Sequence, residues 1–208
     1  MTSWQNAKRG DQIEFGRYPF GEGGEAQSIR WVVLGRSEQG LLALSLYGLE
    51  VRGYHGREQD ITWKDCDLRR WLNADFYETA FSEDERRQIM DTEVYNDGNE
   101  EFEIDGGEDT RDRLFALSLD EFEEFCADED YAAAQPTPYA RKTMQKYGDS
   151  EADEQGAGGW WWLRTPGSEE DFALEVGGYG EVGTEGTPVH WRGGLVRPAL
   201  QLKLPNKS

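Results

Sequence analysis

Helix signals in this chain are confined to residues 62–147, and both flanking regions have the pattern of short strands. Apolar, partly alternating runs predict strands at 12–15, 29–34 and 41–46. Near the other end, residues 196–204 alternate well and predict a closing strand. Strands on either side of a helical middle predict an α+β fold with an antiparallel sheet between the two ends of the chain. Within it, we expect the first strand to pair with the closing strand.

The helices of the middle region have recognisable starts. Four are predicted to begin at side chains that can accept a hydrogen bond from a backbone N–H group of the first turn. These N-caps are Thr62, Ser82, Ser118 and Thr137. The first helix also places four apolar side chains at helical spacing, which predicts one buried face. That face consists of Leu68, Trp71, Leu72 and Phe76.

A length of 208 residues is that of one ordinary domain. We therefore expect a single domain over 1–208, with N-terminal strands at 11–61, a helical middle with an acidic loop at 62–147, and a loop-rich region with a closing strand at 160–204. Eight Trp, nine Tyr and nine Phe provide large side chains for a core despite the low mean hydropathy. Cys66 and Cys126 stand among apolar residues and are predicted to be buried free thiols.

The charge balance limits the classes of partner. Acidic residues number 42 against 22 basic ones, a net charge of -20, and most of the excess lies in residues 82–130. Nucleic-acid binding needs clustered Lys and Arg, so no nucleic-acid partner is expected. No apolar run is long enough for membrane insertion, and the first residues lack the apolar core of a signal peptide. A cytoplasmic or virion-associated location is therefore expected. The oligomeric state is not indicated.

Signatures of catalysis are scarce. His55 and His190 are the only histidines, and neither has metal-ligand spacing. No nucleophile elbow, phosphate-binding loop or dinucleotide fingerprint occurs. Asp97, Asn99 and Glu101 alternate as in some calcium loops, but the glycine and terminal glutamate of an EF-hand are missing. The sequence therefore predicts a protein that is not an enzyme, with no catalytic residue, no metal and no cofactor.

The region around Trp160, Trp161 and Trp162 is the most informative. In a strand, the middle tryptophan points to one face and its neighbours point to the other, so at least one is predicted to pack in the core. Arg164 and Arg197 stand beside this aromatic material, near Pro166 and Pro198, and we expect them to be buried or half-buried and bonded to loop carbonyls. About 30 residues of mixed chemistry separate the two arginines. Long loops held on one end of a domain are typical of function.

Five motifs in order resemble those of a family of bacterial and phage domains with a C-type-lectin-like fold, related to formylglycine-generating enzymes. They are TWKDCDLRRWLNADFYETAFS (62–82), GGEDTRDRLFALSLDEF (106–122), PTPYA (136–140), WWLRTPG (161–167) and GLVRPAL (194–200). The resemblance covers roughly residues 11–204. It implies neither lectin nor oxidase chemistry here, because the calcium-binding and sugar-binding EPN, QPD and WND motifs are missing and residues 160–208 contain no cysteine.

Members of this fold group are similar to the variable proteins of diversity-generating retroelements, in which a C-terminal stretch is rewritten and displayed as a binding surface. The ending usual in that group is GVRPA, and this chain has Gly194-Leu195-Val196-Arg197 instead. The resemblance implies a ligand-binding display protein that contacts a protein partner through residues 168–192. The candidate contact residues are Ser168, Glu169, Glu170, Glu175, Tyr179, Glu181, Thr184, Glu185, His190, Trp191 and Arg192. Tyr179 and Trp191 would be the aromatic anchors.

Two other functions stay open at this point. One is a structural or adhesin domain of a phage or cell surface, with no variable site. The other is a degenerate relative of the formylglycine-generating enzymes. The genes beside this one would discriminate among the three functions. A reverse transcriptase with a template repeat would favour the display protein, virion genes alone would favour the structural domain, and a sulfatase would favour the enzyme relative.

Overall fold

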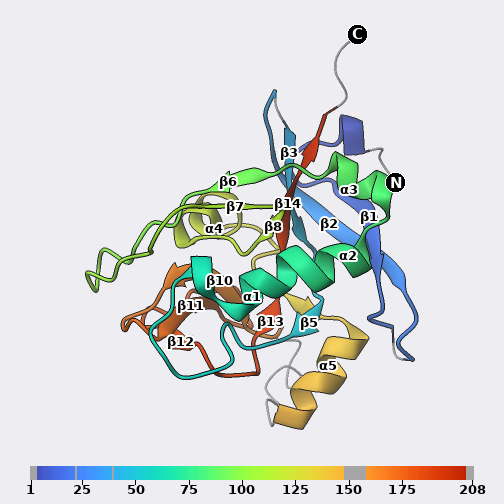
Figure 1. Ribbon diagram of the computed structural model, residues 1–208. Helices are drawn as coiled ribbons and strands as arrows, with labels where there is room; N and C mark the ends of the chain where they lie inside the picture. Colours follow the sequence, from blue (N-terminus) through green and yellow to red (C-terminus); the bar gives the residue numbers. More distant parts are fainter. Residues whose placement is uncertain (1–3, 22, 39, 148–157, 205–208) are drawn as a thin grey trace.

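Both ends of the chain contribute to one antiparallel sheet in the computed structural model, which describes residues 4–21, 23–38, 40–147 and 158–204. The sheet has the strand order β1-β2-β3-β14-β8. Its strands are β1 (Gln12–Tyr18), β2 (Gln27–Arg36), β3 (Gly40–Ser45), β14 (Ala199–Lys203) and β8 (Leu114–Phe115). Figure 1 shows red β14 running beside blue β3, so the closing strand lies inside the sheet. The predicted α+β class is confirmed.

The partner predicted for the first strand is wrong. Within the described part of the chain, β1 pairs with β2, and β14 pairs with β3 on one side and β8 on the other. Strands that follow one another through short connections pair first, which leaves the free edge of β3 for β14. Five consecutive residue pairs, from Ala199↔Leu44 to Lys203↔Gly40, fix the register of that contact.

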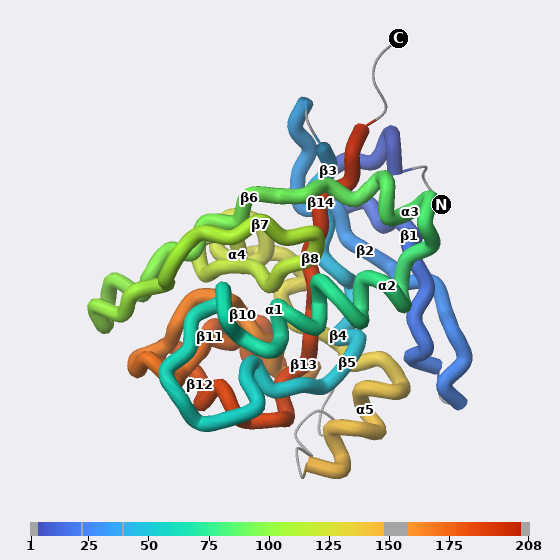
Figure 2. The backbone as a smooth tube through the Cα atoms, in the orientation of Figure 1, coloured from blue at the N-terminus to red at the C-terminus, as the bar shows by residue number. Residues whose placement is uncertain are grey.

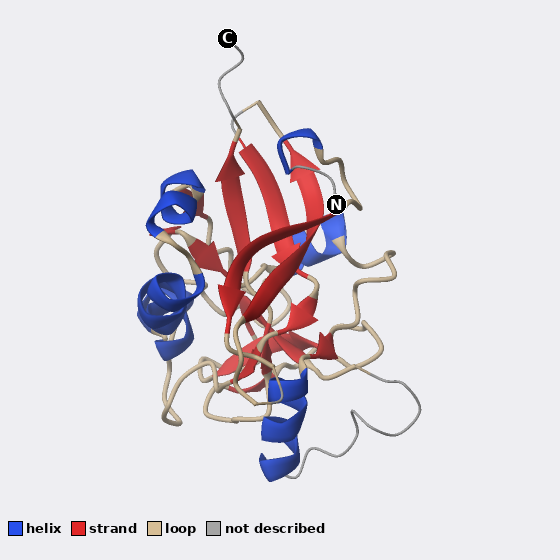
Figure 3. Ribbon diagram, turned by 90° about the vertical axis from the view of Figure 1, so that its right-hand side faces the viewer, coloured by secondary structure: helices blue, strands red, loops and turns tan. Residues whose placement is uncertain are grey.

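A second sheet has the order β12-β11-β10-β13-β5. Its strands are β12 (Thr187–Pro188), β11 (Phe172–Val176), β10 (Trp161–Pro166), β13 (Leu195–Val196) and β5 (Glu50–Val51). The predicted closing strand is therefore divided: its first residue belongs to β13 in this sheet, and β14 belongs to the other sheet. Pro198 stands between the two parts and has no N–H for a ladder. Figure 3 shows the longer strands of the first sheet above the shorter strands of the second.

Two short strand pairs complete the β-structure. β4 (Tyr47–Gly48) and β9 (Gln135–Pro136) are parallel, as are β10 and β13, so the sheets are not purely antiparallel as expected. β6 (Thr92–Val94) and β7 (Thr110–Asp112) form an antiparallel hairpin, so the acidic loop expected at 95–113 is the loop of this hairpin together with its second strand. Figure 2 shows this green hairpin extending to the same side of the molecule as the orange strands of the second sheet.

The helices are short and largely begin where the sequence predicts. α1 (Asp67–Trp71), the π-helical turn η3 (Leu72–Phe76) and α2 (Tyr77–Ala80) follow one another without a break. The other helical elements are η1 (Trp4–Asn6), η2 (Trp63–Asp65), α3 (Glu83–Gln88), α4 (Leu119–Phe125), α5 (Pro138–Met144) and η4 (Gln145–Tyr147). Among the described residues, no helix has the length and apolar character needed to cross a membrane.

Three of the four predicted N-caps are confirmed, because their side-chain oxygen accepts a hydrogen bond from a backbone N–H group of the first turn. They are Ser82 and Ser118, each in a reciprocal capping box, and Thr137 with Pro138 after it. The prediction of an N-cap at Thr62 is wrong, because this residue precedes only the short η2 and its side chain accepts no capping hydrogen bond. The main helix begins four residues later, where Cys66 Sγ accepts a hydrogen bond from the Arg69 N–H at 3.3 Å. A thiol is an uncommon cap, which is why the pattern of hydroxyl caps missed it.

The core is a continuous cluster that includes the predicted helix face. Leu68, Trp71, Leu72 and Phe76 are all buried. Both cysteines are free and buried, as predicted. Burial raises the pKa of the Cys66 thiol to about 12 and that of the Cys126 thiol to about 11. Both thiols are therefore protonated at neutral pH.

Candidate binding surface

The candidate region leaves the second sheet and returns to it on neighbouring strands. Trp161 in β10 pairs with Leu195 in β13, and the Leu195 N–H donates to the Trp160 carbonyl at 2.9 Å. Between these points the chain forms β11, a turn through 177–181 and a return path that ends in β12. The region is the orange and red-orange part of Figure 1. We call residues 168–193 the excursion, and we call the buried residues around Trp160, Trp161 and Trp162, where the chain leaves and rejoins the sheet, its base.

The base is made of tryptophan side chains that alternate as a strand requires. Trp162 is 1% exposed, and its Nε1–H donates to the Arg52 carbonyl at 2.8 Å. Its ring packs edge-on against that of Trp160, with the centroids 4.8 Å apart. Trp161 faces the other way and packs edge-on against Phe122. The prediction that at least one of the three tryptophans packs in the core is confirmed, because Trp161 and Trp162 are both buried.

Glycine at position 194 is needed for this packing. A Cβ added to Gly194 would overlap the Trp162 Nε1 atom and the Trp160 ring. The GLVRPAL motif therefore begins with a residue that lets the returning chain lie directly on the indole rings.

Two buried arginines join the base to the rest of the fold. Arg164 is 4% exposed, and its guanidinium donates to the carbonyls of Ala116 and Tyr95 and to the Glu121 carboxylate. Arg197 donates to the carbonyls of Ser45 and Ala132 and lies 4.9 Å from the centre of the Trp161 ring. The prediction that both arginines bond loop carbonyls is confirmed. Burial lowers the pKa of the Arg197 guanidinium.

The structure leaves most of the candidate contact residues open to solvent. The aromatic anchors are well exposed: Tyr179 by 72% and Trp191 by 54%. The other exposed candidates are Glu169, Glu170, Glu181, Thr184, Glu185 and Arg192, whereas Ser168, Glu175 and His190 are partly buried. In this respect the sequence-based set is consistent with a surface, although three of its members are half covered.

The candidates do not form one patch around both anchors. β12 pairs antiparallel with the first half of β11, at Phe172↔Pro188, and the Val189 N–H donates to the Asp171 carbonyl. Trp191 follows directly from this end. Tyr179 lies in the turn after the opposite end of β11. The five residues of β11 span roughly 15 Å, so the two anchors are parts of separate groups.

Glu175 is a partly buried carboxyl group within the candidate region. Its Oε2 atom is shielded from solvent and has no hydrogen-bond partner in the described structure. Burial raises the pKa of Glu175 from 4.5 to about 7, opposed by a side-chain hydrogen bond with Thr187. The folded state therefore favours the protonated carboxyl group. The contribution of Glu175 to the free energy of unfolding is therefore fully present below its unfolded-state pKa of about 4.5. This contribution is lost as the pH rises through the folded-state pKa of about 7.

We expect Glu175→Gln to remove this pH dependence, because a neutral amide of the same shape has no ionised form to desolvate. After allowance for partial solvent exposure, the wild-type protein should lose about 1–2 kcal/mol more than the variant between about pH 5 and pH 8. Urea midpoints at the two pH values give the measurement. Glu181→Gln, an exposed carboxylate in the next turn, is the control and should behave like the wild type. Parallel pH profiles of wild type and Glu175→Gln would contradict the expectation.

Sequence reasoning missed the segments that border the candidate region. The His55 N–H donates to the Val189 carbonyl at 2.8 Å, and the Ile61 N–H donates to the Glu170 carbonyl at 3.1 Å. The loop of the β6–β7 hairpin is attached through Asn99 Nδ2, which donates to the Pro166 carbonyl at 3.1 Å. These contacts join residues more than 60 positions apart, and no local pattern reports them.

The structure gives Asn99 a role other than metal binding. Its side chain is 8% exposed and is directed to backbone carbonyls of the β10 end, so it does not alternate with Asp97 and Glu101 around an ion. Across the described ranges, no group of three or more His, Cys, Asp or Glu side chains is arranged to hold a metal ion.

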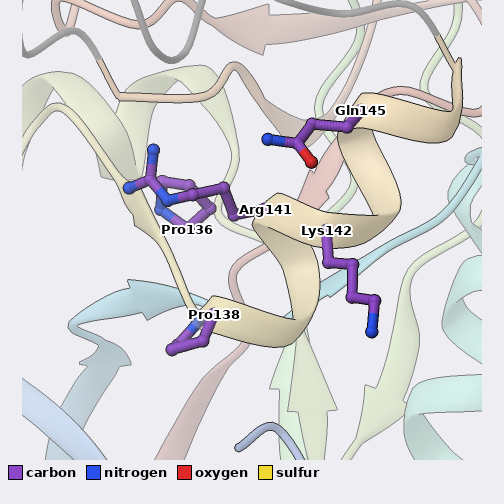
Figure 4. A pocket seen from close by; sticks show the side chains of 5 residues that line it. All are labelled: Pro136, Pro138, Arg141, Lys142 and Gln145. Carbon is purple, nitrogen blue, oxygen red and sulfur yellow. The ribbon is translucent and has the colours of Figure 1, made fainter. Parts of the chain in front are cut away.

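A cavity of about 480 Å³ lies beside α5, away from the candidate residues. Its described lining consists of Pro136, Pro138, Arg141, Lys142 and Gln145 (Figure 4). Figure 4 shows the Arg141 side chain extending over Pro136 and the Lys142 side chain directed elsewhere. None of the candidate contact residues is among the lining residues, so this cavity is separate from the candidate surface.

Fold and site together define an α+β domain in which a buried aromatic base carries an exposed, loop-built surface. The chain belongs to the family described as Domain of unknown function (DUF6273), whose model matches residues 38–204. No curated protein and no solved structure matches the chain. The family match includes the main helix, both buried arginines and the whole candidate region.

Proposed function

We propose that this protein is a ligand-binding display protein with a C-type-lectin-like fold, and that it binds a protein partner through exposed residues of 168–192. The observation that carries the proposal is the exposure of Tyr179 and Trp191 on turns supported by a buried base. Large exposed aromatic side chains are costly to hydrate and are enriched among the residues that dominate protein interfaces. Neighbouring carboxylates would restrict the choice of partner.

The arrangement of the sheets supports the finer assignment of fold. Strands from both chain ends share the first sheet, and the second sheet carries a long excursion that begins after WWLRTPG and ends at GLVRPAL. In variable proteins of diversity-generating retroelements, the rewritten stretch is placed between motifs of this kind. We therefore propose that the exposed positions of 168–192 vary among copies of this protein while the base stays the same.

The state of the cysteines favours binding over oxidase chemistry. A nucleophilic cysteine has to be a thiolate that the substrate reaches. Cys66 and Cys126 are both buried, and burial raises the pKa of each thiol well above neutrality. Neither one lies in the excursion that would face a substrate.

Sequencing the DNA beside the gene and comparing copies of it tests the proposal. We expect a reverse transcriptase gene and a near-identical repeat of the codons for 168–192. Differences between copies should fall on exposed positions such as Tyr179, Glu185 and Trp191, and spare Trp161 and Gly194. A locus with virion genes alone and with the changes spread evenly along the chain would contradict variable-protein status.

Binding itself is tested by comparing variants as bait against host or virion proteins. We expect a specific partner of the wild type to be lost or weakened at least about tenfold in Trp191→Ala or Tyr179→Ala, because truncation of an interface anchor costs about 2 kcal/mol or more. Tyr147→Ala is the matched control, since Tyr147 is 51% exposed and lies outside 168–192. If the wild type and the three variants captured the partner equally, residues 168–192 would be excluded as the contact surface.

A further inference from the structure

A groove of about 340 Å³ lies where three separate segments meet beside the candidate region. One wall is the turn before and within η2, the second is the loop of the β6–β7 hairpin, and the third is the end of β10 with the turn that follows. The lining residues are Asp60, Ile61, Thr62, Asp65, Ile104, Asp105, Gly107, Pro166 and Glu170. Glu170 is the single member of the candidate contact set among them.

The lining combines partly covered apolar walls with exposed acidic groups. Ile61, Ile104 and Pro166 are each partly buried, so the inner surface offers aliphatic carbon. The four carboxylates are exposed and come from all three walls: Asp60, Asp65, Asp105 and Glu170. The groove is therefore apolar along its walls and negative at its opening.

Hydrogen bonds between the walls hold the groove open in one shape. The Ile61 N–H donates to the Glu170 carbonyl, and Asn99 Nδ2 donates to the Pro166 carbonyl. Gly107, at φ 84°, lies against Thr62, where a Cβ would be 2.8 Å from the methyl group. A site formed in advance loses less entropy when a ligand binds.

No basic side chain balances the charge among the described lining residues. Lys64, the nearest base in sequence, is engaged outside the lining by Glu108, with its Nζ 2.5 Å from Oε2. The net charge of the whole chain adds to the negative potential. The chemistry complementary to such a groove is a cation on an aliphatic stem, because the stem contacts apolar walls while the charged group stays at the wet opening.

We propose that this groove binds an arginine or lysine side chain from the protein partner. The inference rests on the proposed function and adds the chemical class of the contact: a basic residue of the partner enters between the hairpin loop and the turn that carries Glu170. The same site extends the interface beyond 168–192 to residues 60–65 and 104–107.

The probe is a blocked pentapeptide with one central arginine, and its counterpart has citrulline in that position. Citrulline keeps the shape of the side chain and removes the charge. We expect saturable amide shifts of Ile61, Ile104 and Glu170 in NMR titrations with the arginine peptide, and affinity at least about fivefold weaker for the citrulline peptide. Raising the salt from about 0.05 M to 0.5 M should weaken the arginine peptide alone.

The double variant Asp60→Asn/Glu170→Gln should weaken arginine-peptide binding about fivefold to tenfold. Both carboxylates are exposed, and neither has a side-chain hydrogen bond within the described structure, so the thermal midpoint should not change. Glu123→Gln/Glu124→Gln removes two exposed carboxylates of α4, outside both the groove and 168–192, so this matched control should bind as the wild type does. Equal binding of the two peptides, or equal loss in the control, would overturn the proposal.

Two further outcomes separate this inference from the proposed function. If spermidine bound more tightly than the arginine peptide and competed with it, the groove would be a site for free polyamines and the proposal would fail. If the double variant kept the full affinity for the protein partner that Trp191→Ala loses, the groove inference would fail and the proposed function would stand.

Discussion

Trp162→Ala should lower the free energy of unfolding by about 3–5 kcal/mol, whereas Trp191→Ala should change it by no more than about 0.5 kcal/mol. The two residues are the same in chemistry and differ in burial: Trp162 is 1% exposed and Trp191 is 54% exposed. Truncation of Trp162 removes the edge-on contacts with Tyr54 and Trp160 and leaves the Arg52 carbonyl without its donor. It also leaves a cavity under the whole excursion.

Urea midpoints of the two variants and the wild type provide the measurement, with far-UV circular dichroism as a check that each variant folds. If Trp162→Ala does not fold, Trp162→Phe should give a smaller loss of the same sign, because the ring is kept and only the indole donor and part of the volume are removed. A Trp191→Ala variant as unstable as the Trp162 variants would mean that the loop at 189–192 is part of the core, and the display surface would be excluded.

Arg164→Met should cost about 2–4 kcal/mol, because the guanidinium is the shared donor for three acceptors in a buried place. Without it the carbonyls of Ala116 and Tyr95 lose a partner, and Glu121 keeps a charge with no cation beside it. The loss is moderated by the 29% exposure of the Glu121 side chain and by the hydrogen bond that it accepts from the Ser118 N–H.

Thermal or urea unfolding compares this variant with Arg192→Met, an exposed arginine of the candidate surface that should be neutral. Arg164→Lys should recover little, since a single ammonium group cannot reach carbonyls on two segments and a carboxylate in the fork geometry. A stable Arg164→Lys would show that the charge alone, rather than the fork, holds the hairpin to β10.

The structure follows the sequence most closely where the determinant is local. Ser82 and Ser118 cap their helices through residues three positions away, and the tryptophans alternate because adjacent strand residues must. The partner of β1 and the division of the closing strand depend instead on which edges are free once the early strands have paired. The Cys66 cap was missed because a thiol accepts hydrogen bonds only weakly.

The candidate surface shows the same division. Tyr179 and Trp191 stand near glycines that predict turns, and the sequence alone therefore predicts that both side chains are exposed. Their separation by the length of β11 follows from a pairing register that short strand stubs do not specify. The groove beside Glu170 depends on three segments of the chain, the most distant of them about 110 positions apart, and such a meeting is a property of the tertiary fold alone.

The parallel contact between β10 and β13 has a consequence for how this domain can change over time. Trp161 and Leu195, at which the chain leaves and rejoins the second sheet, are paired side by side. The excursion is therefore a loop whose two ends are held at a nearly fixed distance. Doubling the length of such a loop adds only about 0.6 kcal/mol of closure entropy. Insertions, deletions or replacement of the whole segment between these two strands should therefore change the free energy of unfolding little. Grafting a foreign loop between β10 and β13 is then a practical route to new specificities.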